Sequence, residues 1–450
     1  MNGRRQSFPT ASSWVSGEAI RADYLHLMSM GRTLYRTSTR AAQPLLGLWL
    51  RRRARRGKEN PDRLDERFAR TRIDLTPAHL VWMHGASIGE TRLLLEVAER
   101  LSTDNPALHF LFTSQTQTAA ELITRFIDSS TQLAGRSRYQ VAPIDTPTIA
   151  ARFLDNWQPR LCVFAEGEIW PNLISEAHAR QIPLALVNAR MTRKSIKGWT
   201  SWKGFAGEIF SSFDVLIAGD TQTAAGLSEL TGRDVPCPGN LKLSLSVPEP
   251  DAGDAQIVRS TFVGGRRCLV AVSTHEGEEE WIIDAAAGIE PRPSLIIIPR
   301  HPERRDSIIA LLKERSLSFS VRSKGETPSV SDDVLLSDTL GEVSLFASLA
   351  DTVYLGGGHA EGVGGHNPVE ILRLGRPVFT GPHIHNFSDL VDRIGDHPGL
   401  MIVETKDDLR RAFPLPPPSV ELMETLEAAA LEPMRMTLSS LEALLEASPS

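Results

Sequence analysis

The feature that most constrains the fold is the alternation of short apolar runs with amphipathic segments, which occurs in two separate blocks. In the first block the apolar runs are His79–His84, His109–Thr113, Tyr139–Pro143, Leu161–Ala165, Leu184–Asn188 and Val215–Ala218. In the second block they are Cys268–Val272, Ser294–Ile298, Val334–Leu336, Val353–Leu355, Pro377–Thr380 and Leu400–Val403. Such runs predict buried strands, and the segments between them, such as Glu90–Leu101, place apolar residues on one helical face. This alternation predicts βαβ units, and therefore an α/β fold with a parallel sheet in each block.

The boundary between the blocks is a stretch rich in proline, glycine and acidic residues at 246–254, which predicts an interdomain linker. A chain of 450 residues is long enough for two domains. We therefore expect an N-terminal segment at 1–60, a first α/β domain at 61–247, a second at 255–415 and a helical tail at 416–450.

Composition excludes several classes of protein. A hydrophobic content of 41% and a charged content of 23% are typical of a globular protein, and the net charge of −6 argues against wholesale binding of nucleic acid. Cys162, Cys237 and Cys268 are far apart, which fits a reducing compartment and predicts neither a disulfide framework nor a zinc site. The first residues lack the apolar core of a signal peptide.

An apolar stretch at 41–50 is followed directly by a basic stretch at 51–58. Ten apolar residues are too few for a transmembrane helix, which needs about 20. An apolar segment that contains tryptophan and has a basic flank can lie in the interface of an anionic membrane. We therefore expect peripheral membrane contact here. The alternative is a surface helix with a solvated run of charges.

The stretch 351–382 combines a strand, a glycine-rich loop and the start of a helix. Its loop contains Gly356, Gly357, Gly358, Gly362, Gly364 and Gly365, and Asn367-Pro368-Val369-Glu370 follows. Glycines let backbone N–H groups approach a ligand, and a helix N-terminus offers unpaired donors, so the arrangement suits a phosphate. Alternatively, Asn367 is an N-cap, Pro368 the first helical residue and Glu370 the third, and the glycines form an ordinary loop. The stretch by itself favours neither interpretation, and it lacks the spacing of a dinucleotide fingerprint.

Glu90 lies in the segment HGASIGE, directly after the first strand of the first block. Ligands of open parallel sheets bind beyond the carboxyl ends of the strands, so this position is a candidate for chemistry. Ser87 and Glu90 also fit the pattern of a capping box. The alternative is that Glu90 serves as a general base. From this pattern alone the cap is the favoured interpretation.

Two carboxylates and several cations follow later strands of the first block. Glu166 and Glu168 come directly before Trp170, whose ring can present an apolar wall to a sugar or a lipid. The basic segment 188–195 follows the fifth strand, and Lys242 lies near the linker. These cations suit an acidic substrate. The alternative is that they are solvated loop residues and that the carboxylates mark a helix start.

Candidate phosphate ligands follow the strands of the second block. Pro299 and Arg300 follow the second strand, and an arginine guanidinium offers a fixed fork of donors. Leu340-Gly341-Glu342 precedes a predicted helix. Together with the glycine-rich loop, these positions predict that the second block binds a nucleotide. Because the sequence contains neither an Asp-x-Asp pair nor two histidines spaced for one helix face, we expect no metal site.

The assembled segments resemble the 3-deoxy-D-manno-octulosonic acid (Kdo) transferases of lipopolysaccharide synthesis. In chain order, the matching segments are LGLWLRRRARRGKENPDRLDERF, HGASIGE, EGEIWPNLI, NARMTRKS, GNLK, STHEGEEE, PRHPER, DTLGEVSLF, GGHNPVE and GPHIHNF. The resemblance implies the GT-B glycosyltransferase fold, in which two Rossmann-like domains face a cleft. It also implies a reaction, the transfer of Kdo from CMP-Kdo to the lipid A precursor lipid IVA, with inversion and without a metal ion or cofactor.

By motif position, the resemblance makes Glu90 the general base and makes Glu166 and Lys242 groups that assist the transition state. It implies CMP contacts by Pro299, Arg300, Leu340, Gly341, Glu342, Asn367, Pro368, Val369 and Glu370. The implied partners are CMP-Kdo, the lipid A precursor and the membrane surface, with no nucleic acid. The implied location is the cytoplasmic face of the cell inner membrane, as a peripheral or monotopic protein. The alternatives are another GT-B nucleotide-sugar enzyme and a non-catalytic nucleotide-binding membrane module.

Overall fold

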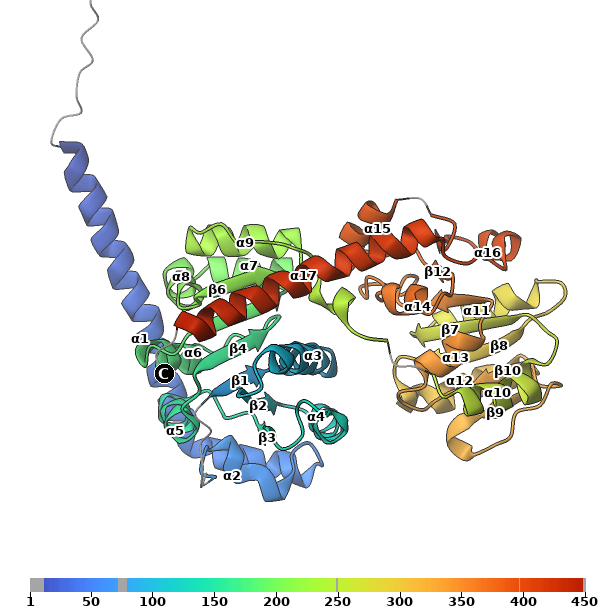
Figure 1. Cartoon of the computed structure of the whole chain (residues 1–450), viewed down its shortest axis with the longest axis horizontal. Coiled ribbons are helices and arrows are strands. Elements are labelled where there is room, and N and C mark those ends of the chain that lie inside the picture. The colour runs from blue at the N-terminus through green and yellow to red at the C-terminus, as the bar shows by residue number, and fades with distance from the viewer. Residues whose placement is uncertain (1–11, 72–78, 248–249, 396, 448–450) are drawn as a thin grey trace, which may run out of the picture. The chain divides into compact units, whose positions relative to one another are not determined.

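The computed structural model describes residues 12–71, 79–247, 250–395 and 397–447, and the chain forms two compact units (Figure 1). Unit 1 comprises Met1–Leu245 and Ala430–Ser450, and unit 2 comprises Ser246–Ala429. Each unit contains its own parallel sheet, which confirms the fold class expected from the two blocks of alternating segments.

Unit 1 is built on a six-stranded sheet in the order β3-β2-β1-β4-β5-β6, with every neighbouring pair parallel. Its strands are β1 (Leu80–His84), β2 (His109–Ser114), β3 (Ser137–Val141), β4 (Leu161–Ala165), β5 (Leu184–Ala189) and β6 (Val215–Ala218). This is the order of a doubly wound sheet, in which the chain changes direction across the sheet between β1 and β4.

Helices join the strands of unit 1. They are α1 (Ser12–Arg55), α3 (Ile88–Asp104), α4 (Gln117–Ser129), α5 (Pro147–Trp157), α6 (Pro171–Ala179), α7 (Arg193–Thr200), α8 (Lys203–Ser211) and α9 (Thr221–Thr231), with the short α2 (Leu64–Arg67), η1 (Pro61–Arg63) and η2 (Leu241–Ser244). Polar residues begin several of them. Ser87, Thr116 and Thr192 each accept a hydrogen bond from the backbone N–H three residues later. These caps start the helices close to the carboxyl ends of the strands.

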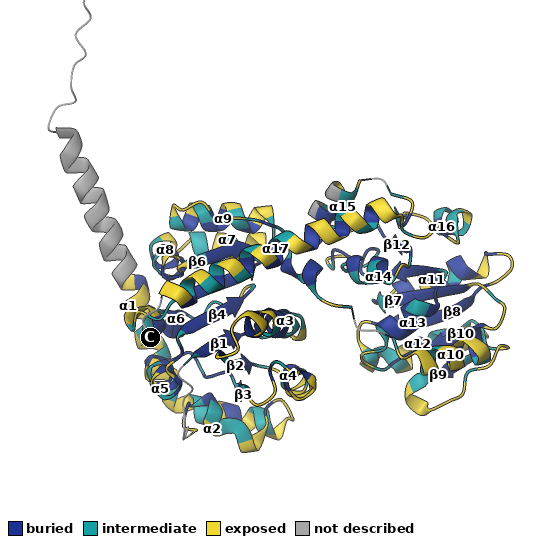
Figure 2. Ribbon diagram, in the orientation of Figure 1, coloured by how far each residue is buried: buried dark blue, intermediate teal, exposed yellow. Residues whose placement is uncertain are grey.

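Both faces of the unit 1 sheet are covered, and its strands are mostly buried (Figure 2). Trp82 and Phe153 belong to the core on one face, and Phe110 belongs to the core on the other. The second core also contains Met434 and Leu441 of α17 (Val420–Ala447). The sequence predicts a helical tail, but its apolar period does not specify the sheet that the tail covers. The packing assigns the end of α17 to unit 1.

Helix α1 is anchored to the body of unit 1 by polar contacts. Tyr35 donates from its hydroxyl to Oδ2 of the buried Asp145 at 2.9 Å, and Arg36 forms an ion pair with Glu176 at 2.9 Å. The same Asp145 carboxylate accepts from the backbone N–H of Leu173 at 2.8 Å, in the first turn of α6. Burial raises the pKa of Asp145, against the opposing effect of these donors. One buried carboxyl therefore holds α1 and α6 together.

The apolar stretch 41–50 lies within α1. Leu45, Leu48 and Trp49 are 66%, 68% and 52% exposed, whereas Leu50 is buried. The stretch is thus helical and largely open to solvent on one side. Within the described ranges, no helix combines the length and the apolar character needed to cross a bilayer.

Unit 2 contains a seven-stranded sheet in the order β13-β12-β11-β7-β8-β10-β9, again parallel throughout. Its strands are β7 (Cys268–Thr274), β8 (Ser294–Pro299), β9 (Phe319–Val321), β10 (Val334–Leu336), β11 (Thr352–Leu355), β12 (Val378–Thr380) and β13 (Leu400–Ile402). β9 is not predicted from the sequence. Three residues at the edge of a sheet, one of them serine, leave too short an apolar run to recognise.

The helices of unit 2 are α10 (Ala252–Val258), α11 (Glu278–Ala287), α12 (Arg305–Glu314), α13 (Val343–Leu349), α14 (Val369–Arg373), α15 (Ser388–Ile394) and α16 (Lys406–Ala412), with the short η3 (Arg259–Val263), η4 (Pro302–Arg304) and η5 (Arg322–Lys324). The linker expected at 246–254 is shorter than predicted, because α10 already begins at Ala252. Asp251 caps that helix by accepting from Gly253 N and Asp254 N. Residues 248–249 of this stretch lie outside the described residues.

Candidate active site

Polar residues stand at the ends of three neighbouring strands of unit 1. His84 ends β1, Glu166 follows β4, and Asn188 lies next to the end of β5. Because these strands are parallel and adjacent, their carboxyl ends meet along one edge of the sheet. The candidate chemistry of unit 1 is gathered there.

Glu166 and Lys242 form an ion pair at this edge. The Nζ of Lys242 lies 2.6 Å from Oε1 of Glu166, and the two side chains are 27% and 14% exposed. Asn188 donates to the same Oε1 at 3.1 Å and accepts from Leu241 N at 2.8 Å. Asn188 therefore ties the strand ends to the segment that carries Lys242. Glu166 and Asn188 have positive φ values of 56° and 50°, a strained conformation that persists only where the surroundings hold it.

Lys242 also lies against the first turn of α3. A Cβ atom at Gly89 would stand 3.3 Å from its Nζ, so the close approach favours glycine at that position. Glu90 is the next residue of the helix. The structure thus brings Lys242 directly to Glu166 and beside the residue that precedes Glu90. The catalytic roles of the three residues stay predictions.

Glu90 is half-buried and forms the capping box that the sequence pattern indicates. Its Oε2 accepts from Ala86 N at 2.7 Å, and its Oε1 accepts from the Ser87 hydroxyl at 2.8 Å. Oε2 also accepts from Ser87 N at 3.4 Å. A carboxylate oxygen has two lone pairs, so Oε1 is the oxygen that keeps acceptor capacity beyond these bonds. The cap therefore holds the carboxylate in place and leaves room for a proton donor.

His84 and Glu168 form a second polar pair at the same edge. Nε2 of His84 lies 3.2 Å from Oε2 of Glu168, which also accepts from the Trp170 indole at 2.9 Å. A carboxylate only accepts, so His84 carries its proton on Nε2 when neutral, and its Nδ1 then accepts from the Thr113 hydroxyl at 2.8 Å. Burial raises the pKa of Glu168, but the His84 and Trp170 bonds outweigh it and the pKa is lowered. His84 is not among the residues predicted from the sequence, although its position at the end of a strand could have indicated it.

In unit 2, a buried carboxylate organises the glycine-rich loop. Oε2 of Glu278 accepts from Gly357 N at 2.7 Å and from His275 N at 2.9 Å. Its Oε1 accepts from His359 N at 3.0 Å and from the Tyr354 hydroxyl at 3.2 Å. Glu278 thereby joins the loop after β7 to the loop after β11. Glu278 is not among the residues predicted from the sequence, because a glutamate in the first turn of a helix is usually solvated.

Two histidines connect the same loops. Nε2 of His275 lies 2.9 Å from Nε2 of His366, and the rings stack with centroids 5.1 Å apart. Burial lowers the pKa of both, to about 4 for His366, where the charges of His275 and Arg300 add to the effect. Near neutral pH both rings are therefore uncharged, and one Nε2–H donates to the other ring. Neither histidine was among the predicted site residues, although His366 lies within GGHNPVE.

Pro299 and Arg300 lie where the sequence analysis expects them, at the carboxyl end of β8. Arg300 is exposed, and its backbone N–H donates to Thr274 O at 3.0 Å. Within the described ranges its guanidinium makes no ion pair. Arg304, by contrast, binds the buried Glu279 through two nitrogens at 2.6 and 2.9 Å. Arg304 is therefore a structural residue, and Arg300 is the arginine available to a ligand.

The remaining predicted nucleotide contacts fall on two loops. Leu340 and Gly341 are exposed, whereas Glu342 accepts from Nε of Arg322 at 3.0 Å. Asn367, Pro368, Val369 and Glu370 are at the start of α14 as predicted, with one correction. The N-cap position is Pro368 and not Asn367, and no capping box forms. The Asn367 side chain instead accepts from Val369 N at 3.1 Å, because two residues is the reach of an Asx turn.

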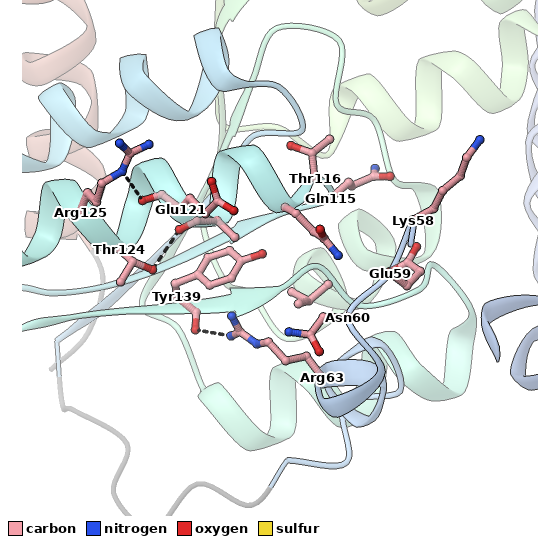
Figure 3. Close-up of a pocket in the computed structure, with 13 residues that line it drawn as sticks. Lys58, Glu59, Asn60, Arg63, Gln115, Thr116, Glu121, Thr124, Arg125 and Tyr139 are labelled. Atoms are coloured by element: carbon pink, nitrogen blue, oxygen red, sulfur yellow. Dashed lines mark hydrogen bonds between the residues drawn. The ribbon is translucent and has the colours of Figure 1, made fainter. Parts of the chain in front are cut away.

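A pocket of about 600 Å³ opens at the carboxyl ends of β2 and β3 (Figure 3). It is lined by Arg63, Arg125, Glu121 and Tyr139 among others, and the Arg63 guanidinium donates to Tyr139 O at 3.1 Å. None of the predicted catalytic residues lines it. Among the described residues, no three His, Cys, Asp or Glu side chains gather as metal ligands.

Comparison with known proteins places the chain in a family. The sequence profile described as "3-Deoxy-D-manno-octulosonic-acid transferase (kdotransferase)" matches residues 62–245. A 3-deoxy-D-manno-octulosonic acid transferase of Bordetella pertussis is 35% identical, over 80% of this chain and 85% of that protein. One of Haemophilus influenzae is 29% identical, over 93% of this chain and 98% of that protein.

The solved structures that resemble the chain share its fold. UDP-GlcNAc 2-epimerase from Neisseria meningitidis, bound to UDP-GlcNAc, superposes with a TM-score of 0.53 at 14% identity, over 81% of this chain and 99% of that one. An identity this low supports the GT-B type of fold alone, and it does not favour epimerase chemistry for this chain.

Replacing Glu278 by glutamine should destabilise unit 2. An amide has only one acceptor oxygen, so in either orientation its NH₂ group faces at least one backbone N–H that the carboxylate now accepts from. A buried donor left without a partner costs about 1–3 kcal/mol. Urea denaturation should show a lower free energy of unfolding for Glu278→Gln. The exposed neighbour Glu276→Gln is the control, and equal unfolding midpoints for the two variants would contradict the expectation.

Proposed function

Because this chain belongs to the 3-deoxy-D-manno-octulosonic acid (Kdo) transferase family and is a glycosyltransferase, we propose that it transfers Kdo from CMP-Kdo to the lipid A precursor lipid IVA, with inversion and without a metal ion. The observation that carries the proposal is the convergence of Lys242 on Glu166 and on the first turn of the helix that bears Glu90. Unit 1 then supplies the acceptor chemistry, and unit 2 supplies the nucleotide site.

In the proposed reaction Glu90 acts as general base. It takes the proton of an acceptor hydroxyl as the hydroxyl oxygen forms a bond to the anomeric carbon of Kdo. The bond from that carbon to the phosphate oxygen of CMP breaks, and its electron pair leaves with CMP. Attack from the face opposite the leaving group inverts the anomeric carbon. The capping bonds from Ala86 and Ser87 support this role, because they hold the carboxylate in one orientation.

We assign Glu166 and Lys242 to the support of the transition state. Lys242 is a partly exposed cation held at a fixed place by Glu166, so it can favour negative charge that develops nearby without first having to reorganise. Asn188 is a positioning residue in this scheme, because it holds both Glu166 and the backbone next to Lys242.

CMP is assigned to unit 2. The proposed contacts are Pro299, Arg300, Leu340, Gly341, Glu342, Asn367, Pro368, Val369 and Glu370. The exposed guanidinium of Arg300 supports this assignment, since it is a strong ligand for a phosphate. The Glu278 carboxylate supports it indirectly by fixing the glycine-rich loop. Charge on the phosphate would be met by arginine and N–H groups in place of a metal ion.

We further propose that residues 41–58, which comprise the end of α1 and the turn after it, place the protein on the cytoplasmic face of the inner membrane. The exposed Leu45, Leu48 and Trp49 can enter the acyl boundary, and Arg51, Arg52, Arg55, Arg56 and Lys58 are exposed to meet anionic headgroups. Arg53 is less available, because it pairs with Glu59 at 3.0 Å.

Glu90→Gln should abolish most of the transfer. Glutamine also serves in a capping box, so the helix keeps its start, but the amide cannot accept the proton. Turnover of CMP-Kdo with lipid IVA should fall by about 10² or more, with binding of CMP-Kdo retained. The matched control is Ser87→Ala, which weakens the cap by about 1 kcal/mol and keeps the carboxylate. Near-normal turnover in Glu90→Gln would leave Glu90 with the capping role alone.

Arg300→Ala should weaken CMP binding. The loss of a hydrogen bond from a charged group corresponds to about 1.5–3 kcal/mol, measurable by titration calorimetry. Arg305→Ala is the control, because Arg305 is in the same unit and faces Asp306 and Asp338. Activity should survive EDTA. Abolition by EDTA with restoration by Mg²⁺ would contradict the metal-free reaction.

The membrane proposal predicts that Leu45, Leu48 and Trp49, all replaced by Asp, reduce flotation of the full-length protein with anionic liposomes. Substitution is preferable to deletion, since removing α1 would leave the buried Asp145 without Tyr35. Ile257, Val330 and Leu431, also exposed and also replaced by Asp, form the matched control. Membrane binding should weaken at high salt, because salt screens the attraction between the basic residues and the anionic headgroups. Equal flotation of both triple variants would place the membrane contact elsewhere.

A further inference from the structure

Unit 1 contains an apolar groove that the proposed chemistry does not use. It lies between α1, α7 and α8 and has a volume of about 510 Å³. Its lining includes Leu34, Tyr35, Trp199, Trp202 and Phe205. Leu34 and Trp202 are 58% and 55% exposed, so large apolar surfaces face solvent along the groove. Apolar surface that stays open in this way marks a place where an apolar partner binds.

Packing of the two helices around Phe205 makes the walls of the groove rigid. Tyr35 and Trp199 both pack on Phe205, with ring centroids 5.9 and 6.2 Å away. The hydroxyl of Tyr35 is already engaged by Asp145, which leaves the ring to the groove. Gly31 allows the close approach of α1 to α8, since a Cβ atom there would stand 2.7 Å from Cβ of Phe205. Most of the groove is therefore built on packed helices, and Trp202 joins it from the turn between α7 and α8.

Gly198 leaves the groove open on the side of α7. A Cβ atom at this position would meet no atom within 4 Å. Glycine in the interior of a helix is unfavourable by roughly 1 kcal/mol relative to alanine, so local helix stability does not explain it. Gly198 is exposed and lines the groove beside Trp199, so a side chain added here has room to enter it.

The surroundings of the groove are cationic. On α7, Arg193, Lys194 and Lys197 are exposed, and Arg193 is bonded to Gln222 at 2.8 Å. Neither lysine forms an ion pair within the described part of the chain. Lys194 lies one helical turn before Gly198 and thus on the same side of α7. An apolar groove with free cations beside it matches a lipid that has an anionic head.

Resting on the proposed function, we propose that this groove receives an acyl chain of the lipid acceptor while the cations of α7 meet its anionic head. The location supports this occupant. Helix α7 begins at Arg193, five residues beyond Asn188, whose amide contacts Glu166. One wall of the groove therefore starts beside the residues assigned to the chemistry. The other wall, α1, is also the helix that carries the exposed apolar residues Leu45, Leu48 and Trp49.

The test fills the groove from Gly198. Gly198→Leu places a side chain in empty space and raises helix propensity, so the fold is retained. Gly198→Ala adds a single methyl group at the same position and is the graded control. With CMP-Kdo as donor, Gly198→Leu should raise KM for tetra-acylated lipid IVA by tenfold or more, since each methylene excluded from an apolar site costs about fourfold in affinity. Gly198→Ala should change KM for lipid IVA by a few-fold. In both variants kcat and the KM for CMP-Kdo should be unchanged.

Equal KM values for lipid IVA in the three proteins would overturn the proposal. Flotation with acceptor-free liposomes separates the other possible occupant, a chain of a bilayer lipid. If Gly198→Leu floats like the unmodified protein, the groove binds a chain of the acceptor. If its flotation falls together with its apparent affinity for lipid IVA, the groove binds a chain of a bilayer lipid.

A binding measurement keeps this inference independent of turnover. Lipid IVA with brominated acyl chains should quench the fluorescence of Trp199 and Trp202, and Gly198→Leu should remove that quenching. Trp202→Phe identifies the responding indole. If the lipid quenches the fluorescence but the unmodified protein transfers no Kdo, the result contradicts the proposed function and still supports acyl-chain binding in the groove. If the protein transfers Kdo but Gly198→Leu leaves the quenching unchanged, the result contradicts only the assignment of the groove.

Discussion

Parallel pairing of the strands brings the carboxyl ends of all neighbouring strands to one edge of each sheet. The polar groups of the candidate sites lie close together because of that arrangement. His84, Glu166 and Asn188 come from strands far apart in the sequence, and they meet because β1, β4 and β5 are neighbours. In unit 2 the loops after β7, β8 and β11 meet for the same reason. Each sheet thus offers one polar edge, while its apolar faces are covered by helices.

The loops at these edges are held by buried or half-buried polar side chains. Asn188 bonds Glu166 and Leu241 in unit 1, and Glu278 bonds the loops that follow β7 and β11 in unit 2. Glu166 and Asn188, at 56° and 50°, have a positive φ that is strained for a residue with a side chain. The hydrogen bond between their side chains helps to hold these two strand ends in that conformation. A site held in this way needs little reorganisation when a charged substrate arrives.

Helix α1 is joined to unit 1 by a few specific contacts, and it exposes several large apolar side chains near its C-terminal end. The Tyr35–Asp145 hydrogen bond and the Arg36–Glu176 ion pair fix its middle, whereas Leu45, Leu48 and Trp49 face solvent. The same fixed helix supplies one wall of the apolar groove. Attachment to a membrane and contact with a lipid acceptor are thereby proposed for one continuous element.

The sequence by itself determined the two parallel sheets, nearly all of their strands and the segments that carry Glu90, Glu166, Lys242 and Arg300, because strand burial and strand-end motifs are local patterns. The sequence did not decide between two interpretations of a local pattern, such as a helix cap and a general base for Glu90. The structure shows that Glu90 is in a capping box and that its neighbour Gly89 lies against Lys242. Tertiary structure alone decided the rest. Glu278 binds residues about 80 positions away, the end of α17 packs into unit 1, and the groove forms where Gly31 meets Phe205. These contacts join segments distant in the chain, and periodicity carries no information about which apolar faces will meet.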